Sequence, residues 1–175
     1  GHAILQAREF CDGESFVTIF PDDVIINDVS ATEPLMQVYR EHGGSVLAVP
    51  ETADEIIHTK GVVGGSSKGD GVHEVDALVE KPALKDAPRN LAIVARYILN
   101  NAVFDYLAEE HAGAGGEVQI TDAIASLLGN SPIHAREISG FHADTGNPGG
   151  MLQAAIHVAK QDPELAEIVN QALRG

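Results

Sequence analysis

The fold is decided by residues 15–28, which read SFVTIFPDDVIIND. Residues 16–20 form an apolar run with the length and β-branched content of a strand buried on both faces in a parallel sheet. Pro21 ends the ladder because proline has no N–H to donate. Asp22 and Asp23 follow at the carboxyl end of this strand, which is where open α/β sheets bind their ligands. A carboxylate at this position can hold a divalent cation against a phosphate. The alternative is a solvated aspartate pair at a polar strand end.

Length and composition predict one globular domain, residues 1–175. No apolar run approaches the roughly 20 residues that a membrane span needs. The net charge of −15 argues against nucleic acid and anionic membranes as partners, although one lysine and a metal can still hold a phosphate locally. The single cysteine, Cys11, cannot form an internal disulfide, which favours a reducing, cytoplasmic location.

The order of apolar runs and helical spacings predicts an α/β protein with a mixed, mostly parallel sheet and flanking helices. A helix at 34–42 and a buried strand at 45–49 imply a parallel crossover from the first strand. Residues 59–81 predict a hairpin that leaves the main sheet, with a loop at 66–71. The expected elements that follow are strands at 90–99 and 133–138, and helices at 102–110, 121–128 and 151–173, the last broken near Asp162 and Pro163. Helical spacing starts at the first residues, so the N-terminal βα units of such a sheet are expected to be missing.

The motif LVEKP ends one apolar run with Glu80 and Lys81. Adjacent strand residues point to opposite faces, so we expect these two side chains not to pair with each other. One acceptor and one cation delivered into a cleft suit a ligand with hydroxyls and a phosphate. The alternative is an exposed polar strand end.

Two glycine-rich stretches carry further candidates. In GAGGEVQITD, Glu117 follows glycines that permit a close backbone approach to a ligand, and we expect Asp122 to be structural, in the first turn of a helix. In HADTGNPGG, Asp144 lies in a tight loop. The loop is either a simple turn, or it places Asp144 beside Asp22 so that the two carboxylates bind one Mg²⁺. The sequence has no HxH or HExxH spacing and no P-loop, which argues against zinc and P-loop chemistry.

The order of eight segments resembles one known family: GHAIL, FPDDVI, GGSVLAV, KGVV, VEKP, APRNLAIVARYIL, GAGGEVQITDA and ADTGNPGGMLQA. Together they resemble the bacterial UTP–glucose-1-phosphate uridylyltransferases of the sugar-nucleotide pyrophosphorylase superfamily. The resemblance runs over nearly all of the chain but covers only the later part of the family's length. The family's GxGTRxxPxTK loop, which grips the nucleoside triphosphate, is not in this sequence.

The resemblance implies a Rossmann-like nucleotidyltransferase fold and a homodimer or homotetramer that converts UTP and glucose 1-phosphate to UDP-glucose and pyrophosphate. It implies the following site residues: Asp22 and Asp144 as Mg²⁺ ligands, with Asp23 a neighbour of undecided role; Glu80 and Glu117 on sugar hydroxyls; Lys81 on the sugar phosphate; Gly61 beside the sugar; and Gly1 beside the nucleotide base. Lys81 and Asp22 are thereby the candidate catalytic residues.

Two positions depart from the family pattern, because Lys60 stands where a tyrosine is usual and Ala95 where a glycine is usual. The methyl group of Ala95 puts the fit to glucose in question. Two alternatives stay open: a relative with another nucleotide or sugar, such as a thymidylyltransferase, and a non-catalytic fragment that binds sugar phosphate.

Overall fold

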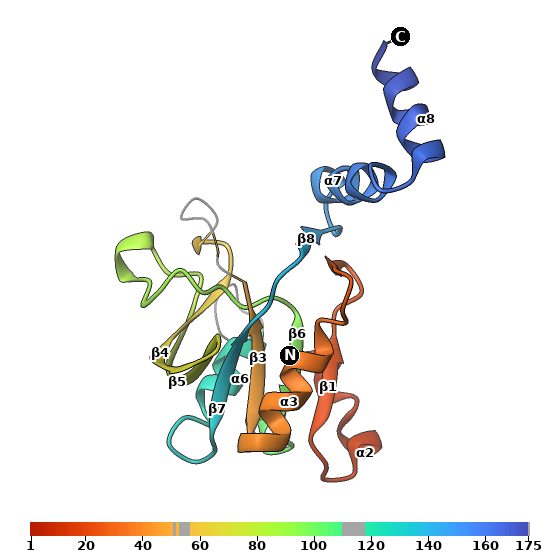
Figure 1. Ribbon diagram of the computed structural model, residues 1–175. Coiled ribbons are helices and arrows are strands. Elements are labelled where there is room, and N and C mark those ends of the chain that lie inside the picture. Colours follow the sequence, from red (N-terminus) through yellow and green to blue (C-terminus); the bar gives the residue numbers. More distant parts are fainter. Residues whose placement is uncertain (51, 53–56, 110–117, 175) are drawn as a thin grey trace. The chain divides into compact units, whose positions relative to one another are not determined.

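The computed structural model describes residues 1–50, 52, 57–109 and 118–174 (Figure 1). The chain forms two compact units, each built from two segments of sequence. Unit 1 contains Gly1–Ile19 and Ser30–Ile138, and unit 2 contains Phe20–Val29 and Ser139–Gly175. The division of the chain into one domain or more stays a prediction.

Unit 1 is built on a six-stranded sheet in the order β1-β6-β3-β7-β5-β4 (Figure 1). Its strands are β1 (Phe16–Ile19), β3 (Ser45–Val49), β4 (Gly61–Gly69), β5 (Val72–Glu80), β6 (Arg96–Leu99) and β7 (Ile133–Glu137). β3 is parallel to β7, and the other described pairings are antiparallel. The mixed α/β class is therefore confirmed, but the parallel share of the sheet is smaller than expected.

The helices of unit 1 are α1 (His2–Leu5), α2 (Arg8–Cys11), α3 (Thr32–His42), α5 (Val103–Ala108) and α6 (Ile120–Ala125), with the 3₁₀ turn η1 (Leu84–Asp86). α3 packs on β3, β6 and β7 through the buried side chains of Leu35 and Val38. It ends at Gly43, whose φ of +68° suits glycine and whose N–H donates to the Tyr39 carbonyl. α6 packs on β5.

The core of unit 1 lies around β3, of which every residue is buried. Phe104 of α5 and Ile124 of α6 are fully buried, as are Leu47 of β3 and Ile133 of β7. Such apolar burial supplies most of the favourable free energy of folding, at about 25 cal/mol for each Å² removed from water. The buried strand expected at 45–49 is therefore confirmed.

Unit 2 consists of a two-stranded antiparallel ribbon followed by two helices. β2 (Asp23–Ile26) pairs with β8 (Phe141–Asp144), and α7 (Pro148–Ala159) and α8 (Pro163–Arg174) follow. Phe141 stacks on His157 of α7 with ring centroids 3.9 Å apart. The break expected near Asp162 and Pro163 is confirmed, and Asp162 Oδ1 accepts the N–H groups of Glu164 and Leu165 at the start of α8.

The expectation for residues 16–20 was wrong in one respect. β1 does not lie in the middle of a parallel ladder buried on both faces, because it pairs antiparallel with β6 at an edge of the described sheet. Val17 and Ile19 alternate with half-buried residues and are 41% and 50% exposed. β1 and β3 are nevertheless parallel to each other, because both run antiparallel to β6, which lies between them.

Four further features differ from the sequence expectations. The hairpin β4–β5 does not leave the main sheet but forms its other edge, because β5 pairs with β7. Its turn is shorter than expected, at Asp70 and Gly71. Residues 141–144, expected as loop, are strand β8, and residues 23–26 form the unpredicted strand β2.

The described helices are all too short or too polar to cross a lipid bilayer.

Candidate active site

Asp22, Asp23 and Asp144 are brought together within unit 2 by the register of the β2–β8 ribbon. Asp23 is directly opposite Asp144, and Asp22 precedes β2. Directly opposite residues of an antiparallel pair lie on the same face, with Cβ atoms about 5 Å apart. Asp144 is thus a neighbour in space of Asp22 and Asp23, which lie more than a hundred residues earlier in the sequence.

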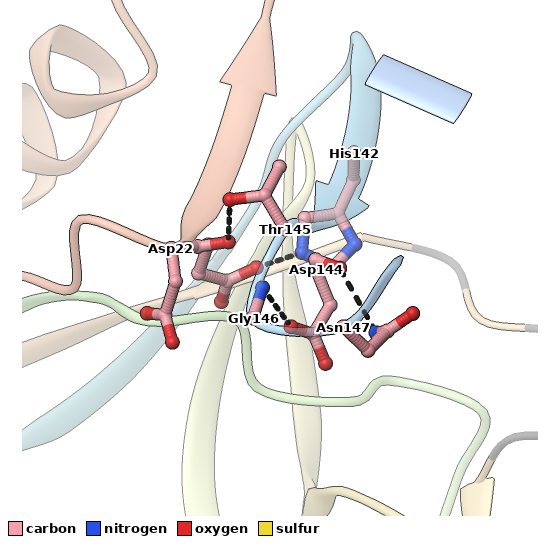
Figure 2. Close-up of polar contacts among 7 residues, drawn as sticks. Asp22, His142, Asp144, Thr145, Gly146 and Asn147 are labelled. Atoms are coloured by element: carbon pink, nitrogen blue, oxygen red, sulfur yellow. Dashed lines mark hydrogen bonds and ion pairs between the residues drawn. The ribbon is translucent and has the colours of Figure 1, made fainter. Parts of the chain in front are cut away.

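The turn after β8 ties Asp22 to Asp144 (Figure 2). Thr145 donates from its backbone N and from Oγ1 to the Asp22 carbonyl, at 2.7 and 2.9 Å. Gly146 N donates to Asp144 Oδ1 at 3.0 Å, and Asn147 Nδ2 donates to the Asp144 carbonyl at 3.0 Å. The TGN sequence therefore fixes the backbone of Asp22 and the carboxylate of Asp144 in one small turn.

The carboxylates of Asp22 and Asp144 approach the same point beside Gly146. A Cβ atom on Gly146 would lie 2.9 Å from Asp22 Oδ2 and 3.1 Å from Asp144 Oδ1. A side chain at this position would collide with the first oxygen and crowd the second, so glycine is what lets the two carboxylates come this close.

This donor set fits Mg²⁺, which typically takes one or two protein carboxylates together with substrate phosphates and water. A larger protein cage is not present in the part of the chain that the structure describes, where no group of three or more His, Cys, Asp or Glu side chains is placed to hold a metal. The arrangement is therefore suited to a cation that arrives with, or is completed by, a phosphate-bearing ligand.

The helix that follows holds this turn in place. Asn147 caps α7, because its Oδ1 accepts the N–H of Gly150 at 2.9 Å, and Pro148 occupies the first turn, where its missing N–H costs nothing. Gly150 approaches the Asp144 carbonyl so closely that an added Cβ would lie 1.8 Å from the oxygen. The NPGG sequence thus packs the start of α7 directly against the backbone of Asp144.

His142 contacts the third carboxylate. Its Nε2 donates to Asp23 Oδ1, and the two side chains are only 22% and 11% exposed. His142 was not among the residues singled out from the sequence, because no metal-ligand or catalytic spacing surrounds it.

Unit 1 brings together Gly61 and Glu80, which the sequence analysis also singled out. They are directly paired across β4 and β5. A Cβ on Gly61 would lie 2.9 Å from Thr121 Oγ1 and 3.1 Å from Glu80 Oε2. Thr121 is buried in α6, and the Glu80 side chain is 13% exposed. A glycine, a sheltered carboxylate and a hydroxyl therefore meet at the end of the hairpin.

Lys81 corrects one expectation. We expected Glu80 and Lys81 not to pair, but Lys81 Nζ lies 3.7 Å from Glu80 Oε1. The reason is that Lys81 has a φ of +47°, which ends the strand and removes the alternation of side chains. Its backbone N donates to the Lys60 carbonyl at 3.0 Å, and its side chain is half exposed.

The remaining candidates are less defined. Gly1 precedes α1 and is tightly packed, since a Cβ there would lie 2.4 Å from the Val118 carbonyl oxygen. Ala95 is buried, and Lys60 contacts Lys81 through its backbone. Glu117 lies outside the described residues, so its predicted role stays a prediction.

One cleft of unit 1 contains none of the predicted site residues. It has a volume of about 410 Å³ and is lined by His73, Arg89, Asn90, Leu91 and Glu137. His73 lies near the start of β5, whereas Glu80 ends that strand.

A protein-family model and several curated proteins match this chain. Residues 1–161 match the protein family described as "Nucleotidyl transferase". A UTP–glucose-1-phosphate uridylyltransferase of Staphylococcus epidermidis is 39% identical over 167 residues, which are 95% of this chain and 58% of that protein. One from Staphylococcus haemolyticus is 38% identical with the same coverage.

Solved structures give the same result. The crystal structure of a UDP-glucose pyrophosphorylase complexed with UDP-glucose superposes with a TM-score of 0.85 at 34% identity, covering 91% of this chain and 61% of that one. A UTP-bound UGPase from Acinetobacter baumannii superposes with a TM-score of 0.85 at 25% identity, covering 98% and 60%.

The chain spans about 58% of the length of the first curated relatives that it matches. The resemblance noted from the eight sequence segments is confirmed by relatives with that same name, and the Rossmann-like α/β class by the matching structures. With the family match over residues 1–161, these observations establish that the chain belongs to the nucleotidyl transferase family.

Proposed function

We propose that the protein carrying this chain is a UTP–glucose-1-phosphate uridylyltransferase, which transfers UMP from UTP to glucose 1-phosphate and releases pyrophosphate. The observation that carries the proposal is the convergence of Asp22 and Asp144 on Gly146, which suits a metal that is shared with phosphates. The relatives support the identity of the two substrates, since their structures are described as UDP-glucose-bound and UTP-bound.

The proposed reaction needs no general base from the protein. An oxygen of the sugar phosphate attacks the α-phosphate of UTP in line, the bond to the β-phosphate breaks, and pyrophosphate leaves. A phosphate monoester with a second pKa of about 6 is already ionised at pH 7. The protein therefore has to position two polyanions and offset their charge. A metal held by carboxylates and a lysine would offset the charge, and glycines would allow close approach, so that no serine–histidine pair is needed.

Asp22 and Asp144 would hold the Mg²⁺ in this proposal, with the backbone of Asp22 held by Thr145 and the carboxylate of Asp144 held by Gly146. When bound, the ion supplies positive charge that offsets the negative charge of the reacting phosphates. The turn would contribute by fixing the Asp22 backbone and the Asp144 carboxylate before any ligand arrives, which reduces the ordering that binding requires.

Lys81 and Glu80 would bind the sugar phosphate. The Lys81 side chain is half exposed and would bind the phosphate, and Glu80 would supply acceptor oxygens for sugar hydroxyls beside Gly61. The hydroxyl of Thr121 lies at the same place and is an additional candidate contact. Gly1 and Glu117 keep the roles that the resemblance implies, on the nucleotide base and on sugar hydroxyls.

The proposal is tested by measuring pyrophosphate release from UTP, dTTP, CTP and ATP, each with glucose 1-phosphate and Mg²⁺. We expect UTP to be the preferred nucleotide and UDP-glucose to be the product identified by mass. Preference for dTTP would replace the proposal with a thymidylyltransferase. Binding of glucose 1-phosphate without pyrophosphate release from any nucleotide would favour the non-catalytic alternative.

A homodimer or homotetramer in the cytoplasm remains part of the proposal. Sedimentation equilibrium of the purified protein tests the oligomeric state, and a monomer at micromolar concentration would contradict it.

A further inference from the structure

We propose that His142 is a positioning residue that withdraws Asp23 from the metal, so that the cation takes two carboxylates, Asp22 and Asp144, rather than three. This inference rests on the proposed function, because it concerns the same metal site, and it assigns a role to a histidine that the function did not require.

The need for such a residue follows from the crowding of carboxylates in unit 2. Asp22 and Asp23 are consecutive, and Asp23 is directly opposite Asp144 in the β2–β8 ribbon. Asp23 and Asp144 therefore share a face of the ribbon at a spacing of about 5 Å between their Cβ atoms. A cation at Asp144 is within reach of Asp23 unless another contact holds that side chain.

His142 supplies this contact. It precedes Asp144 by two residues on β8, so it lies on the same face of the ribbon and is the diagonal neighbour of Asp23. Its Nε2 donates to Asp23 Oδ1 (Figure 2). Both side chains are largely shielded from water, and a charge-assisted hydrogen bond is stronger in such surroundings.

Asp22 and Asp144 are held differently, by the turn after β8, which bonds the backbone carbonyl of Asp22 and the carboxylate of Asp144. Gly146 N donates to Asp144 Oδ1. The three atoms nearest to the Cβ position of Gly146 belong to Asp22 and Asp144, and none belongs to Asp23. The structure thus separates one pair of carboxylates beside Gly146 from a third carboxylate bonded to His142.

The number of carboxylates that bind the cation sets the net charge of the site and therefore affects phosphate binding. A divalent cation with two carboxylates has no net charge and still attracts phosphate oxygens. A third carboxylate would make the site net negative and would repel a pyrophosphate or triphosphate at close range, where little water screens the interaction. By holding Asp23, His142 would favour phosphate ligands over tighter binding of the bare metal.

The test measures Mn²⁺ binding to the whole protein by electron paramagnetic resonance, with and without pyrophosphate. Mn²⁺ is a spectroscopic probe with the same preference for carboxylate oxygens as Mg²⁺. We expect Asp22→Asn to weaken Mn²⁺ binding by about tenfold or more, and Asp23→Asn to change it by less than about twofold.

The decisive variants are His142→Phe and the double variant His142→Phe with Asp23→Asn. We expect His142→Phe to bind Mn²⁺ alone about threefold or more tighter, and to lose most of the tightening that pyrophosphate gives the parent protein. Adding Asp23→Asn should restore both values, because the released carboxylate is removed. His157→Phe, which keeps a ring against Phe141 in the same unit, is the matched control and should behave like the parent protein.

Three outcomes overturn the inference. If Asp23→Asn weakens Mn²⁺ binding as much as Asp22→Asn, the site has three carboxylates and only the role of His142 is wrong. If His142→Phe weakens binding with and without pyrophosphate and Asp23→Asn does not rescue it, His142 is merely structural. If none of the aspartate variants changes Mn²⁺ binding, the proposed metal site fails and the inference fails with it.

Discussion

Lys81 shows how one backbone angle places the side chain of a candidate site residue. A φ of +47° is uncommon for a residue other than glycine, asparagine or aspartate, and such conformations often occur at ligand sites, where the surrounding structure maintains them. Here the hydrogen bond from Lys81 N to the Lys60 carbonyl holds the bend, and the ammonium group lies near Glu80 while half exposed. This position is compatible with the proposed role of Lys81 on the sugar phosphate.

We predict that Lys81→Ala lowers kcat by about two to three orders of magnitude, because the charge on the reacting phosphates is no longer offset. Steady-state pyrophosphate release measures the loss, and circular dichroism checks that the fold is kept. Lys85→Ala, which removes the charge of an exposed lysine in η1, is the control and should leave turnover unchanged. Near-normal turnover of Lys81→Ala would remove this residue from the proposed mechanism.

Gly146 is the second residue at which one added atom should affect the proposed metal site. We predict that Gly146→Ala weakens Mn²⁺ binding by about tenfold, because the new methyl group would force apart the carboxylates of Asp22 and Asp144. Gly149→Ala is the control, since a Cβ there meets only Asn147 Oδ1, at 3.3 Å. Equal Mn²⁺ affinities of the two variants would show that the closeness of the carboxylates does not matter for the metal.

The turn from β8 into α7 is the element that ties Asp22 to Asp144. Its hydrogen bonds come from three consecutive residues, Thr145, Gly146 and Asn147, and each bond reaches Asp22 or Asp144. Asn147 also caps α7, so the start of the helix and the position of Asp144 depend on one side chain. Loss of this cap should therefore loosen the carboxylate site as well as the helix.

We predict that Asn147→Ala costs about 1 kcal/mol of stability in α7, the usual cost of losing an N-cap. Amide hydrogen exchange should be faster in the first turn of α7 and at Gly146, while the core of unit 1 keeps its protection. Gln153→Ala, on the exposed face of the same helix, is the matched control. Unchanged exchange at Gly146 would mean that the turn does not depend on the helix cap.

At the scale of the whole molecule, the candidate residues fall into two groups within two compact units. Gly1, Gly61, Glu80 and Lys81 belong to unit 1, and the three aspartates belong to unit 2. Each group is organised by contacts inside its own unit. A change in the stability of one unit can therefore be measured separately from the geometry of the residues in the other.

The environment of His134 makes the free energy of unfolding of unit 1 depend on pH. Burial in β7 lowers the pKa of His134 below its usual value of 6.5, and the nearby His42, whose ring centroid is 4.8 Å away, contributes in the same direction. The folded protein thus binds fewer protons at His134 than the unfolded chain between the lowered pKa and 6.5. This contribution to stability is fully present above about pH 6.5 and is lost as the pH falls through the folded pKa.

Urea unfolding between pH 5 and 8 tests this prediction. We expect the free energy of unfolding to fall less steeply with decreasing pH in His134→Gln than in the parent protein. The difference in slope should correspond to the uptake of at most about one proton on unfolding. His58→Gln, which replaces an exposed histidine of the same unit, is the control. Identical slopes for His134→Gln and the parent protein would contradict a lowered pKa.

The sequence allowed most of the candidate residues to be predicted because they follow motifs. Apolar runs are followed by charged residues at Asp22, Glu80 and Lys81, and such strand ends can be recognised from the sequence alone. Thr121 and His142 were missed, because a helical threonine and a lone histidine carry no spacing signal. Their neighbours, Gly61 and Asp23, lie 60 and 119 residues away in sequence.

What the sequence determined by itself was the α/β class, the buried strand β3, the break between α7 and α8, and the family. These follow from local apolar patterns, from Pro and Gly positions and from motif order. Only the tertiary structure decided the edge position of β1, the contact between Lys81 and Glu80, and the separation of Asp23 from the other two aspartates. The physical reason is that strand partners, a positive φ and diagonal side-chain contacts depend on residues distant in sequence, which periodicity and spacing do not encode.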